Sequence, residues 1–310
     1  MPGPMLGTTA LSLKGSVCAL VTPFAGDGSL DEDALLTLID WHLDAGTRAL
    51  VVAGSTGEAA MLDEAEYRRL LELSVARVAG RIPVLAGTGA AGTARTLAQT
   101  KLARDCGIDA ALVATPHYVR PTQEGLFRHF SVIADESGLP VVLYNVPART
   151  ACDLQPATVE RLHRHPAIIG IKEAVADPGR LAELLPLRHD GFVILSGDDE
   201  TACAAMTGGA DGVVSVAANI VPRAFAQMCD HAVGGQADAA RAIDAGLRDL
   251  YAMLGAEPNP IPAKWLLHRL GWMGPEPRLP LTPLSAAHHA RADAVLANLA
   301  GLAELRTETR

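Results

Sequence analysis

The chain has 310 residues, of which 49% are hydrophobic and 20% are charged, so it is long enough to bury a full core. Its 26 basic and 35 acidic residues give a formal net charge of −9, and no run of Lys or Arg could track a phosphate backbone, which argues against a nucleic-acid partner. Residues 1–15 lack the basic start and apolar core of a signal peptide, and no stretch of about 18 uninterrupted apolar residues follows, so neither export nor membrane spanning is indicated.

Eight short apolar runs recur along the chain, and each is followed by turn residues and then by a stretch with helical spacing. The runs predict strands at residues 16–21, 49–52, 84–86, 110–114, 141–144, 168–172, 193–195 and 212–216. The stretches between them predict helices at residues 31–45, 63–79, 93–106, 123–137, 156–165, 178–187, 200–207 and 222–233. Eight such units predict a closed (β/α)₈ barrel, a TIM barrel, whose parallel strands are covered on both faces.

After residue 233 the pattern changes to helices without strands. These are predicted at residues 237–254, 260–270 and 285–302, separated by the Pro- and Gly-rich stretches EPNPIP and GPEPRLPLTP. We interpret them as a helical appendage packed on the barrel. We predict three parts: a leader at residues 1–15, a catalytic barrel at 16–235 and a helical domain at 236–310. The sequence does not predict an ordered structure for the leader.

The 5 cysteines are odd in number, widely spaced and free of any Cys-x-x-Cys pair. This pattern favours reduced thiols over a disulfide framework or a zinc site, and it predicts a cytoplasmic protein. The 10 histidines show no His-x-x-x-His or similar ligand spacing. We therefore expect no metal, and the sequence predicts no cofactor.

The carboxyl ends of barrel strands are where such folds carry their chemistry, and the strand at 168–172 ends on Lys172. Desolvation at this position disfavours the ammonium form, leaving an amine that can attack a carbonyl group. Taken alone, a lysine at a strand end is more often a solvated surface group. The neighbouring strand ends therefore decide the interpretation.

Three other segments face the same rim: GSTGE after the second strand, TPHY (residues 115–118) after the fourth and YNVPART (residues 144–150) after the fifth. The second strand is followed by GSTGE, whose glycines and two hydroxyls, from Ser55 and Thr56, can cradle a carboxylate. Tyr144 ends its strand so that its hydroxyl can reach the lumen near Lys172 and move protons. Arg149 offers a planar fork that suits a carboxylate. Singly, each has an ordinary explanation as a tight turn, a structural tyrosine or a solvated arginine.

Two motifs could indicate other functions, and the surrounding sequence disfavours both. The sequence GTGAAG at residues 87–92 matches the Gly-x-Gly-x-x-Gly pattern of dinucleotide sites, but the next strand closes on Thr115 and Pro116 where a ribose site needs an acidic residue. A serine hydrolase is disfavoured because Ser55 stands in GSTG and not in a Gly-x-Ser-x-Gly elbow.

In chain order, the segments GSTGE, TPHYVRPTQEGL, YNVPARTACD, GIKEA, LSGDD, GVVSVAAN and EPNPIPAKW resemble the 4-hydroxy-tetrahydrodipicolinate synthase (dihydrodipicolinate synthase) family, within the class I pyruvate-dependent aldolases and lyases. The resemblance covers residues 16–285. It implies a lyase that condenses pyruvate with L-aspartate 4-semialdehyde through a lysine Schiff base, in the biosynthesis of diaminopimelate and lysine.

The resemblance also implies the roles of the site residues. Lys172 forms the Schiff base with pyruvate, Ser55 and Thr56 hold the pyruvate carboxylate, and Tyr144 passes protons. Arg149 grips the carboxylate of aspartate semialdehyde.

Further members of the implied site include a residue that acts between subunits. Tyr118 reaches the neighbouring subunit's site and links Tyr144 to the hydroxyl of Ser55 in a relay, so the resemblance implies a homodimer or, commonly, a homotetramer. The lumen wall is completed by Gly197, Asp198 and the backbone of Val214.

Two alternative functions stay open. The synthases usually carry Thr-Thr where this chain has Ser55 and Thr56, and GSTGE is common in N-acetylneuraminate lyases; serine keeps the hydroxyl but loses the β-branching that restricts χ1. The second candidate is therefore such a lyase or another pyruvate-dependent sugar-acid aldolase, although Arg149 within YNVPART disfavours it. The third is a pyruvate-binding sensor without turnover, which the complete catalytic set argues against.

A regulatory expectation rests on four positions. Relatives that L-lysine inhibits resemble one another in having histidine or glutamate at the position of Tyr67, asparagine at Ala91, glutamate at Arg95 and tyrosine at His117. This chain departs at all four, and Glu64 is the one nearby residue that could contact the ammonium of a bound lysine. We predict an activity that is insensitive to L-lysine.

Overall fold

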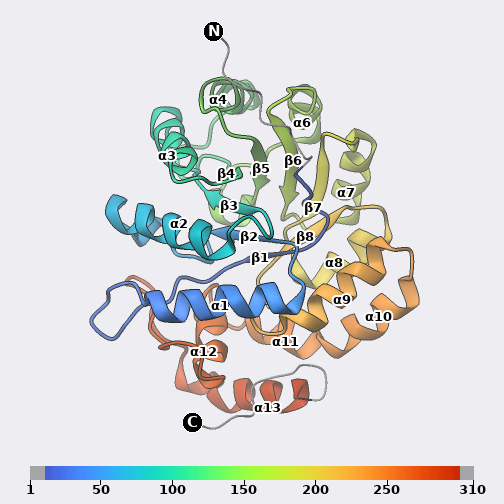
Figure 1. Ribbon diagram of the computed structural model, residues 1–310. Helices are drawn as coiled ribbons and strands as arrows, with labels where there is room; N and C mark the ends of the chain where they lie inside the picture. Colours follow the sequence, from blue (N-terminus) through green and yellow to red (C-terminus); the bar gives the residue numbers. More distant parts are fainter. Residues whose placement is uncertain (1–10, 301–310) are drawn as a thin grey trace.

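A computed structural model describes residues 11–300 (Figure 1). Residues 1–10 of the predicted leader and residues 301–310 of the predicted helical domain lie outside the described part. In the described part, eight parallel strands close into a barrel in the order β1 to β8, which confirms the predicted (β/α)₈ fold. Between residues 11 and 300, no helix has the length and apolar character that crossing a bilayer requires.

The observed strand ends differ from the predicted ones by at most two residues. The strands are β1 (Gly15–Ala19), β2 (Ala49–Val52), β3 (Val84–Gly87), β4 (Ala110–Ala114), β5 (Val141–Asn145), β6 (Ile168–Glu173), β7 (Val193–Ser196) and β8 (Gly212–Ser215).

The helices around the barrel also follow the prediction, with one short addition, α5, in the loop after β5. They are α1 (Glu32–Ala45), α2 (Glu64–Val78), α3 (Thr93–Asp105), α4 (Gln123–Glu136), α5 (Pro147–Thr150), α6 (Pro156–Leu162), α7 (Pro178–Leu184), α8 (Asp199–Thr207) and α9 (Pro222–Val233). Short 3₁₀ turns are η1 (Ala59–Met61), η2 (Leu185–Leu187) and η3 (Ala217–Asn219).

The helical appendage differs from the prediction in detail. The single helix expected at residues 237–254 is two helices, α10 (Ala237–Gly246) and α11 (Arg248–Leu254), because the chain turns at the buried Leu247. Gly246, a weak helix former, stands at this break. The helix expected at 285–302 begins as the 3₁₀ turn η4 (Ala286–His288) and continues as α13 (His289–Leu299).

Helix α12 (Ile261–Arg269) brings the appendage to the rim where the strands end. It packs against η3, the turn that directly follows β8. Figure 1 shows α11, α12 and α13 gathered on one side of the barrel, next to α1. The appendage therefore lies beside the carboxyl-terminal rim of the barrel.

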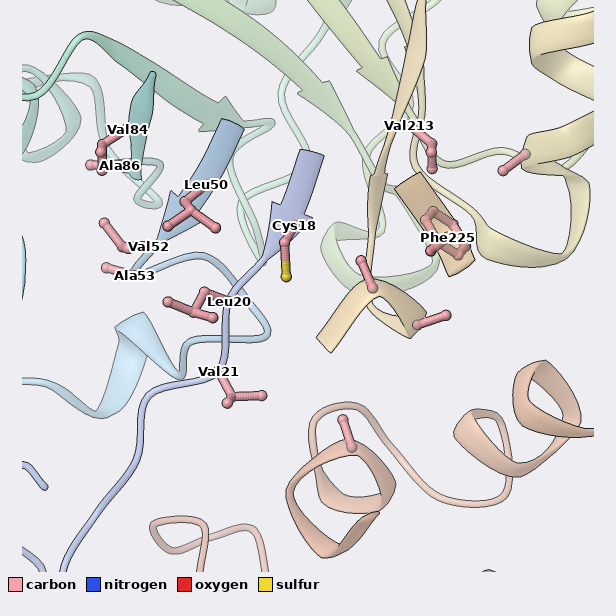
Figure 2. Close-up of a cluster of buried hydrophobic side chains, with 14 of the residues drawn as sticks. Cys18, Leu20, Val21, Leu50, Val52, Ala53, Val84, Ala86, Val213 and Phe225 are labelled. Atoms are coloured by element: carbon pink, nitrogen blue, oxygen red, sulfur yellow. The ribbon is translucent and has the colours of Figure 1, made fainter. Parts of the chain in front are cut away.

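The strands separate two apolar clusters. On β1, Val17 belongs to the cluster inside the barrel, whereas the next residue, Cys18, belongs to the outer cluster under the helices. Figure 2 shows part of the outer cluster, with Cys18 and Leu50 from neighbouring strands and Phe225 from α9. Because both faces are apolar, side chains alternate in space without alternating in polarity, as expected for a sheet that is covered on both faces.

Candidate active site

The two residues predicted at the centre of the site lie side by side. Lys172 on β6 is in register with Tyr144 on β5, so both side chains point to the same face of the sheet, into the lumen. The Nζ atom of Lys172 lies 4.2 Å from the centre of the Tyr144 ring. Lys172 is 6% exposed and Tyr144 is 8% exposed. Within the described part of the chain, the Lys172 amine has no acidic partner and no hydrogen bond.

Gly197, which directly follows β7, makes room for this lysine. A Cβ atom at Gly197 would lie 3.0 Å from the Cε atom of Lys172 and 2.8 Å from the Cβ atom of Ala174. Both distances are too short for ordinary packing. The Gly197 backbone N–H donates to the carbonyl of Glu173 at 2.7 Å, which fixes the loop next to the end of β6.

The GSTGE turn follows β2 and presents its two hydroxyls differently. Ser55 is exposed, whereas Thr56 is 4% exposed and its Oγ1 accepts a hydrogen bond from Nδ2 of Asn259 at 2.9 Å. The carbonyl of Gly57 accepts from the Thr22 hydroxyl at 2.7 Å. Hydrogen bonds from Asn259 and Thr22 therefore hold the turn in place, while Ser55 stays exposed.

Asn259 is a site residue that the sequence interpretation missed. Its carbonyl oxygen accepts from Nη2 of Arg149 at 3.2 Å, while its side chain donates to Thr56, so it connects two predicted substrate contacts. Its Oδ1 atom is buried and has no hydrogen-bond partner among residues 11–300. Asn259 is 203 residues away from Thr56, and although EPNPIPAKW belongs to the resemblance, nothing in the segment indicated a contact with the turn.

Tyr118 lies apart from the other predicted catalytic residues. It is 90% exposed, and its backbone φ of 72° is in the left-handed region that residues other than glycine rarely occupy. Within residues 11–300 of one subunit, no hydrogen bond joins the hydroxyls of Tyr118, Tyr144 and Ser55. The relay between them is not formed inside a single chain.

The remaining predicted residues line the wall between β7 and β8. Val214 is 1% exposed and faces the lumen. Asp198 caps helix α8, since its carboxylate accepts from the N–H of Thr201 at 3.0 Å and from its hydroxyl at 2.6 Å. Asp199, which the sequence interpretation did not single out, accepts two backbone N–H groups of the loop after β8 at 3.1 and 2.8 Å. Burial raises the pKa of the Asp199 carboxyl.

A polar network holds the end of β6 from outside the barrel. Glu173 follows Lys172 and points the opposite way, where Asn145 donates to its two carboxylate oxygens at 3.1 and 3.0 Å. Arg180 lies 3.5 Å from Glu173 and forms an ion pair with Asp153 at 2.7 Å. Burial raises the pKa of Glu173, and the hydrogen bonds from Asn145 oppose that rise. The network fixes the strand from which Lys172 extends.

The glycines that matched a dinucleotide motif have a packing role. A Cβ atom at Gly87 would lie 2.2 Å from the carbonyl oxygen of Ala53, and one at Gly89 would lie 2.7 Å from the backbone nitrogen of Ala114. Close contact between backbones thus requires both glycines. Among residues 11–300, no three His, Cys, Asp or Glu side chains are grouped as metal ligands.

Comparisons with known proteins identify the family of this chain. The family model "Dihydrodipicolinate synthetase family" matches residues 12–299. The 4-hydroxy-tetrahydrodipicolinate synthase of Xanthomonas axonopodis pv. citri is 56% identical over 95% of this chain and 97% of its own length, and that of Stenotrophomonas maltophilia strain K279a is 52% identical over 95% and 99%. The dihydrodipicolinate synthase of Acinetobacter baumannii, solved with pyruvate, is 41% identical with a TM-score of 0.91 over 94% of this chain and 100% of that one. The chain belongs to the dihydrodipicolinate synthetase family.

Proposed function

We propose that this enzyme condenses pyruvate with L-aspartate 4-semialdehyde to give 4-hydroxy-tetrahydrodipicolinate, through a Schiff base on Lys172. The observation that carries the proposal is a buried lysine amine, without an acidic partner in the described chain, against Tyr144 at the carboxyl rim of a barrel. The activity is the one for which the curated relatives are named.

The covalent chemistry follows from this placement. The Lys172 amine attacks the ketone carbon of pyruvate, water leaves, and an imine forms. Loss of a proton from the pyruvate methyl group gives an enamine, which attacks the aldehyde carbon of the second substrate, and the aldehyde oxygen takes up a proton to become a hydroxyl. The amino group of the second substrate then attacks the imine carbon and displaces the Lys172 amine, which closes the ring and frees the enzyme. The Tyr144 hydroxyl, on the ring beside the amine, gives and takes the protons of these steps.

Two separate groups bind the two substrate carboxylates. Ser55 and Thr56 hold the pyruvate carboxylate at the turn after β2. Arg149 on α5 binds the carboxylate of the semialdehyde. Its side chain is exposed, the one hydrogen bond of its guanidinium in the described chain goes to Asn259, and no acidic residue there forms an ion pair with it. The lumen wall next to the imine consists of Gly197, Asp198 and Val214.

The working unit is a homodimer or a homotetramer. The exposed Tyr118, held at a strained backbone angle, extends into the site of a neighbouring subunit and joins Tyr144 and Ser55 in a proton relay. All five cysteines are free thiols, which supports action in the cytoplasm.

The alternative functions have weaker support. Ser55 is the one observation that favours an N-acetylneuraminate lyase. However, relatives at 52% and 56% identity carry the synthase name, and Arg149 supplies a cation where a sugar substrate needs groups that bind hydroxyls. A silent pyruvate-binding sensor has no observation in its favour.

The enzyme is insensitive to L-lysine. Tyr67 is 3% exposed, and its hydroxyl donates to the carbonyl of Gly87 at 2.9 Å, so it is already engaged within the subunit. Arg95 and His117 are exposed. Replacing an attractive contact by a repulsive one at Arg95 costs a lysine ammonium about 2 kcal/mol at about 4 Å even in water.

A turnover assay tests both proposals together. With pyruvate and L-aspartate 4-semialdehyde we expect product formation, little changed by L-lysine at about 1 mM, which would be saturating for a site of micromolar affinity. Cleavage of N-acetylneuraminate at a higher kcat/KM would overturn the proposed reaction. Inhibition by submillimolar L-lysine would overturn the regulatory proposal alone.

A further inference from the structure

The barrel enzyme contains a second buried lysine, outside the lumen. Lys264 on α12 is 0% exposed, and its Nζ atom lies 2.6 Å from Oε1 of Glu58, whose side chain is equally buried. The other carboxylate oxygen of Glu58 accepts the backbone N–H of Arg278 at 2.8 Å. The Lys264 amine also lies 4.2 Å from the centre of the Phe24 ring. Both oxygens of the acid and the cation are therefore satisfied.

Glu58 is the last residue of the GSTGE turn, which contains the proposed contacts to the pyruvate carboxylate. Its backbone φ is 55°, and Ala53, just before the turn, has a φ of 48°. Both lie in the left-handed region, which costs residues other than glycine energy and persists only where the surroundings enforce it. The turn therefore needs external contacts to keep its shape.

Stability alone does not account for the buried ion pair. Removing two charges from water costs several kcal/mol per ion, and a hydrophobic pair of similar volume is often at least as stable. Burial lowers the pKa of Lys264, although the charge of Glu58 opposes that change. What the pair provides, and an apolar pair would not, is a short directional contact that fixes one atom of the turn.

The same segment of the appendage contacts the turn a second time. Asn259, which precedes α12, donates to the hydroxyl of Thr56 at 2.9 Å, and Lys264 lies on the first turns of that helix. Residues 259–264 thus hold both Thr56 and Glu58, on the two sides of Gly57. The segment reaches the turn from behind, while Ser55 stays exposed.

We propose that Lys264 and Glu58 are positioning residues for pyruvate binding: the ion pair between them holds the carboxylate-binding turn at Ser55 and Thr56 in its productive shape. Helix α12 of the appendage is then part of the pyruvate site, although Lys264 itself touches no substrate. This proposal rests on the proposed function and adds which contacts keep the pyruvate site in its shape.

Two variants test the proposal. Lys264→Met removes the pair, whereas Glu58→Asp keeps the charge, shortens the side chain by one methylene and suits the left-handed backbone, which aspartate tolerates better than most residues. We expect the KM for pyruvate to rise about tenfold in Lys264→Met and about threefold in Glu58→Asp, with kcat at saturating pyruvate within about threefold, as for loss of binding geometry. The KM for the semialdehyde should stay within about twofold.

Asp211→Asn is the matched control. Asp211 is buried at the opposite, amino-terminal end of the strands, where it accepts from Arg188 at 2.8 Å and from the N–H of Ile194 at 3.0 Å. This variant should lower the melting temperature without changing the KM for pyruvate. If Glu58→Asp is folded and its KM for pyruvate is unchanged, the pair is structural only and the proposal is wrong, even if Lys264→Met does not fold. An inactive wild-type protein would instead contradict the proposed function.

Discussion

The lumen of the barrel and the region behind the GSTGE turn each bury a lysine, in opposite ways. Lys172 in the lumen is 6% exposed and faces an aromatic ring, with no acid beside it among the described residues. Lys264 behind the turn is 0% exposed and forms an ion pair with Glu58 at 2.6 Å. Both lysines also lie 4.2 Å from a ring centre, so the acidic partner is what distinguishes them.

This difference separates a reactive lysine from a structural one. An ammonium held by a carboxylate is fixed in position, which suits it to hold a backbone turn. An amine that no carboxylate holds is free to approach and attack a carbonyl carbon. Burial alone therefore does not identify a catalytic lysine.

The largest expected effect comes from Lys172→Met. Because the change removes the covalent step, kcat/KM should fall by several orders of magnitude. The melting temperature should change little, since no ion pair is broken. Lys264→Met should lose much less kcat/KM, about tenfold through the KM for pyruvate. It should lose about 3–5 kcal/mol in unfolding free energy because Glu58 is left buried without its cation. Thermal melting and steady-state kinetics on the two variants measure these effects on stability and on kcat/KM. A melting temperature of Lys172→Met as low as that of Lys264→Met would contradict the proposed difference between the two lysines.

The next largest effect is expected from Tyr118→Phe, because the proposal places Tyr118 in the site of a neighbouring subunit. The change removes one hydroxyl from a side chain that is 90% exposed in the single subunit, so the fold should be unaffected. Loss of a proton-transfer group should lower kcat by about 10²-fold. Full activity in a preparation shown to be monomeric by sedimentation would contradict the shared site.

Arg149→Ala has a smaller expected effect, confined to one substrate. Loss of a charge-assisted contact to the semialdehyde carboxylate should cost about 1.5–3 kcal/mol in kcat/KM for that substrate. Formation of the Lys172 imine with pyruvate should persist, because Arg149 is not part of the pyruvate site. Unchanged kinetics with the semialdehyde would favour the alternative sugar-acid substrates.

The smallest effect concerns His42, a buried base that, like Lys172, has no acidic partner in the described part of the chain. His42 is 0% exposed, its Nε2 atom makes no hydrogen bond with any residue from 11 to 300, and burial lowers its pKa from 6.5 to about 3. Since its folded pKa lies below the unfolded value, its contribution to stability is complete above pH 6.5 and is lost as the pH falls toward 3. The loss is about 1.4 kcal/mol per pH unit below 6.5. Between pH 7.5 and 5.5, the unfolding free energy measured with denaturant should fall less steeply in His42→Gln than in the wild-type protein. Equal slopes would show that His42 does not cause the pH dependence.

Local sequence signals predicted the barrel well because each strand and helix carries its own pattern. The run at 110–114 is a strand with the predicted bounds, and α2 begins and ends within one residue of the helix predicted at 63–79. Tyr144 and Lys172 could be placed together because both end parallel strands, whose carboxyl ends share one rim.

The contacts behind the site could not be predicted in the same way. Glu58 and Lys264 are 206 residues apart, and no local pattern marks either as a member of a pair. Asn259 stands in a Pro-rich stretch whose composition indicates only a loop. The proposed relay through Tyr118 requires a second subunit, so neither a local sequence pattern nor the fold of one chain can contain it.

Reductive trapping tests the central claim most directly. Borohydride added in the presence of pyruvate converts a lysine imine into a stable secondary amine, which trypsin does not cleave. We expect a modified peptide spanning residues 165–180, uncut at Lys172, and none from protein treated without pyruvate. Modification of the peptide spanning residues 249–269, at Lys264, with Lys172 unmodified, would contradict it.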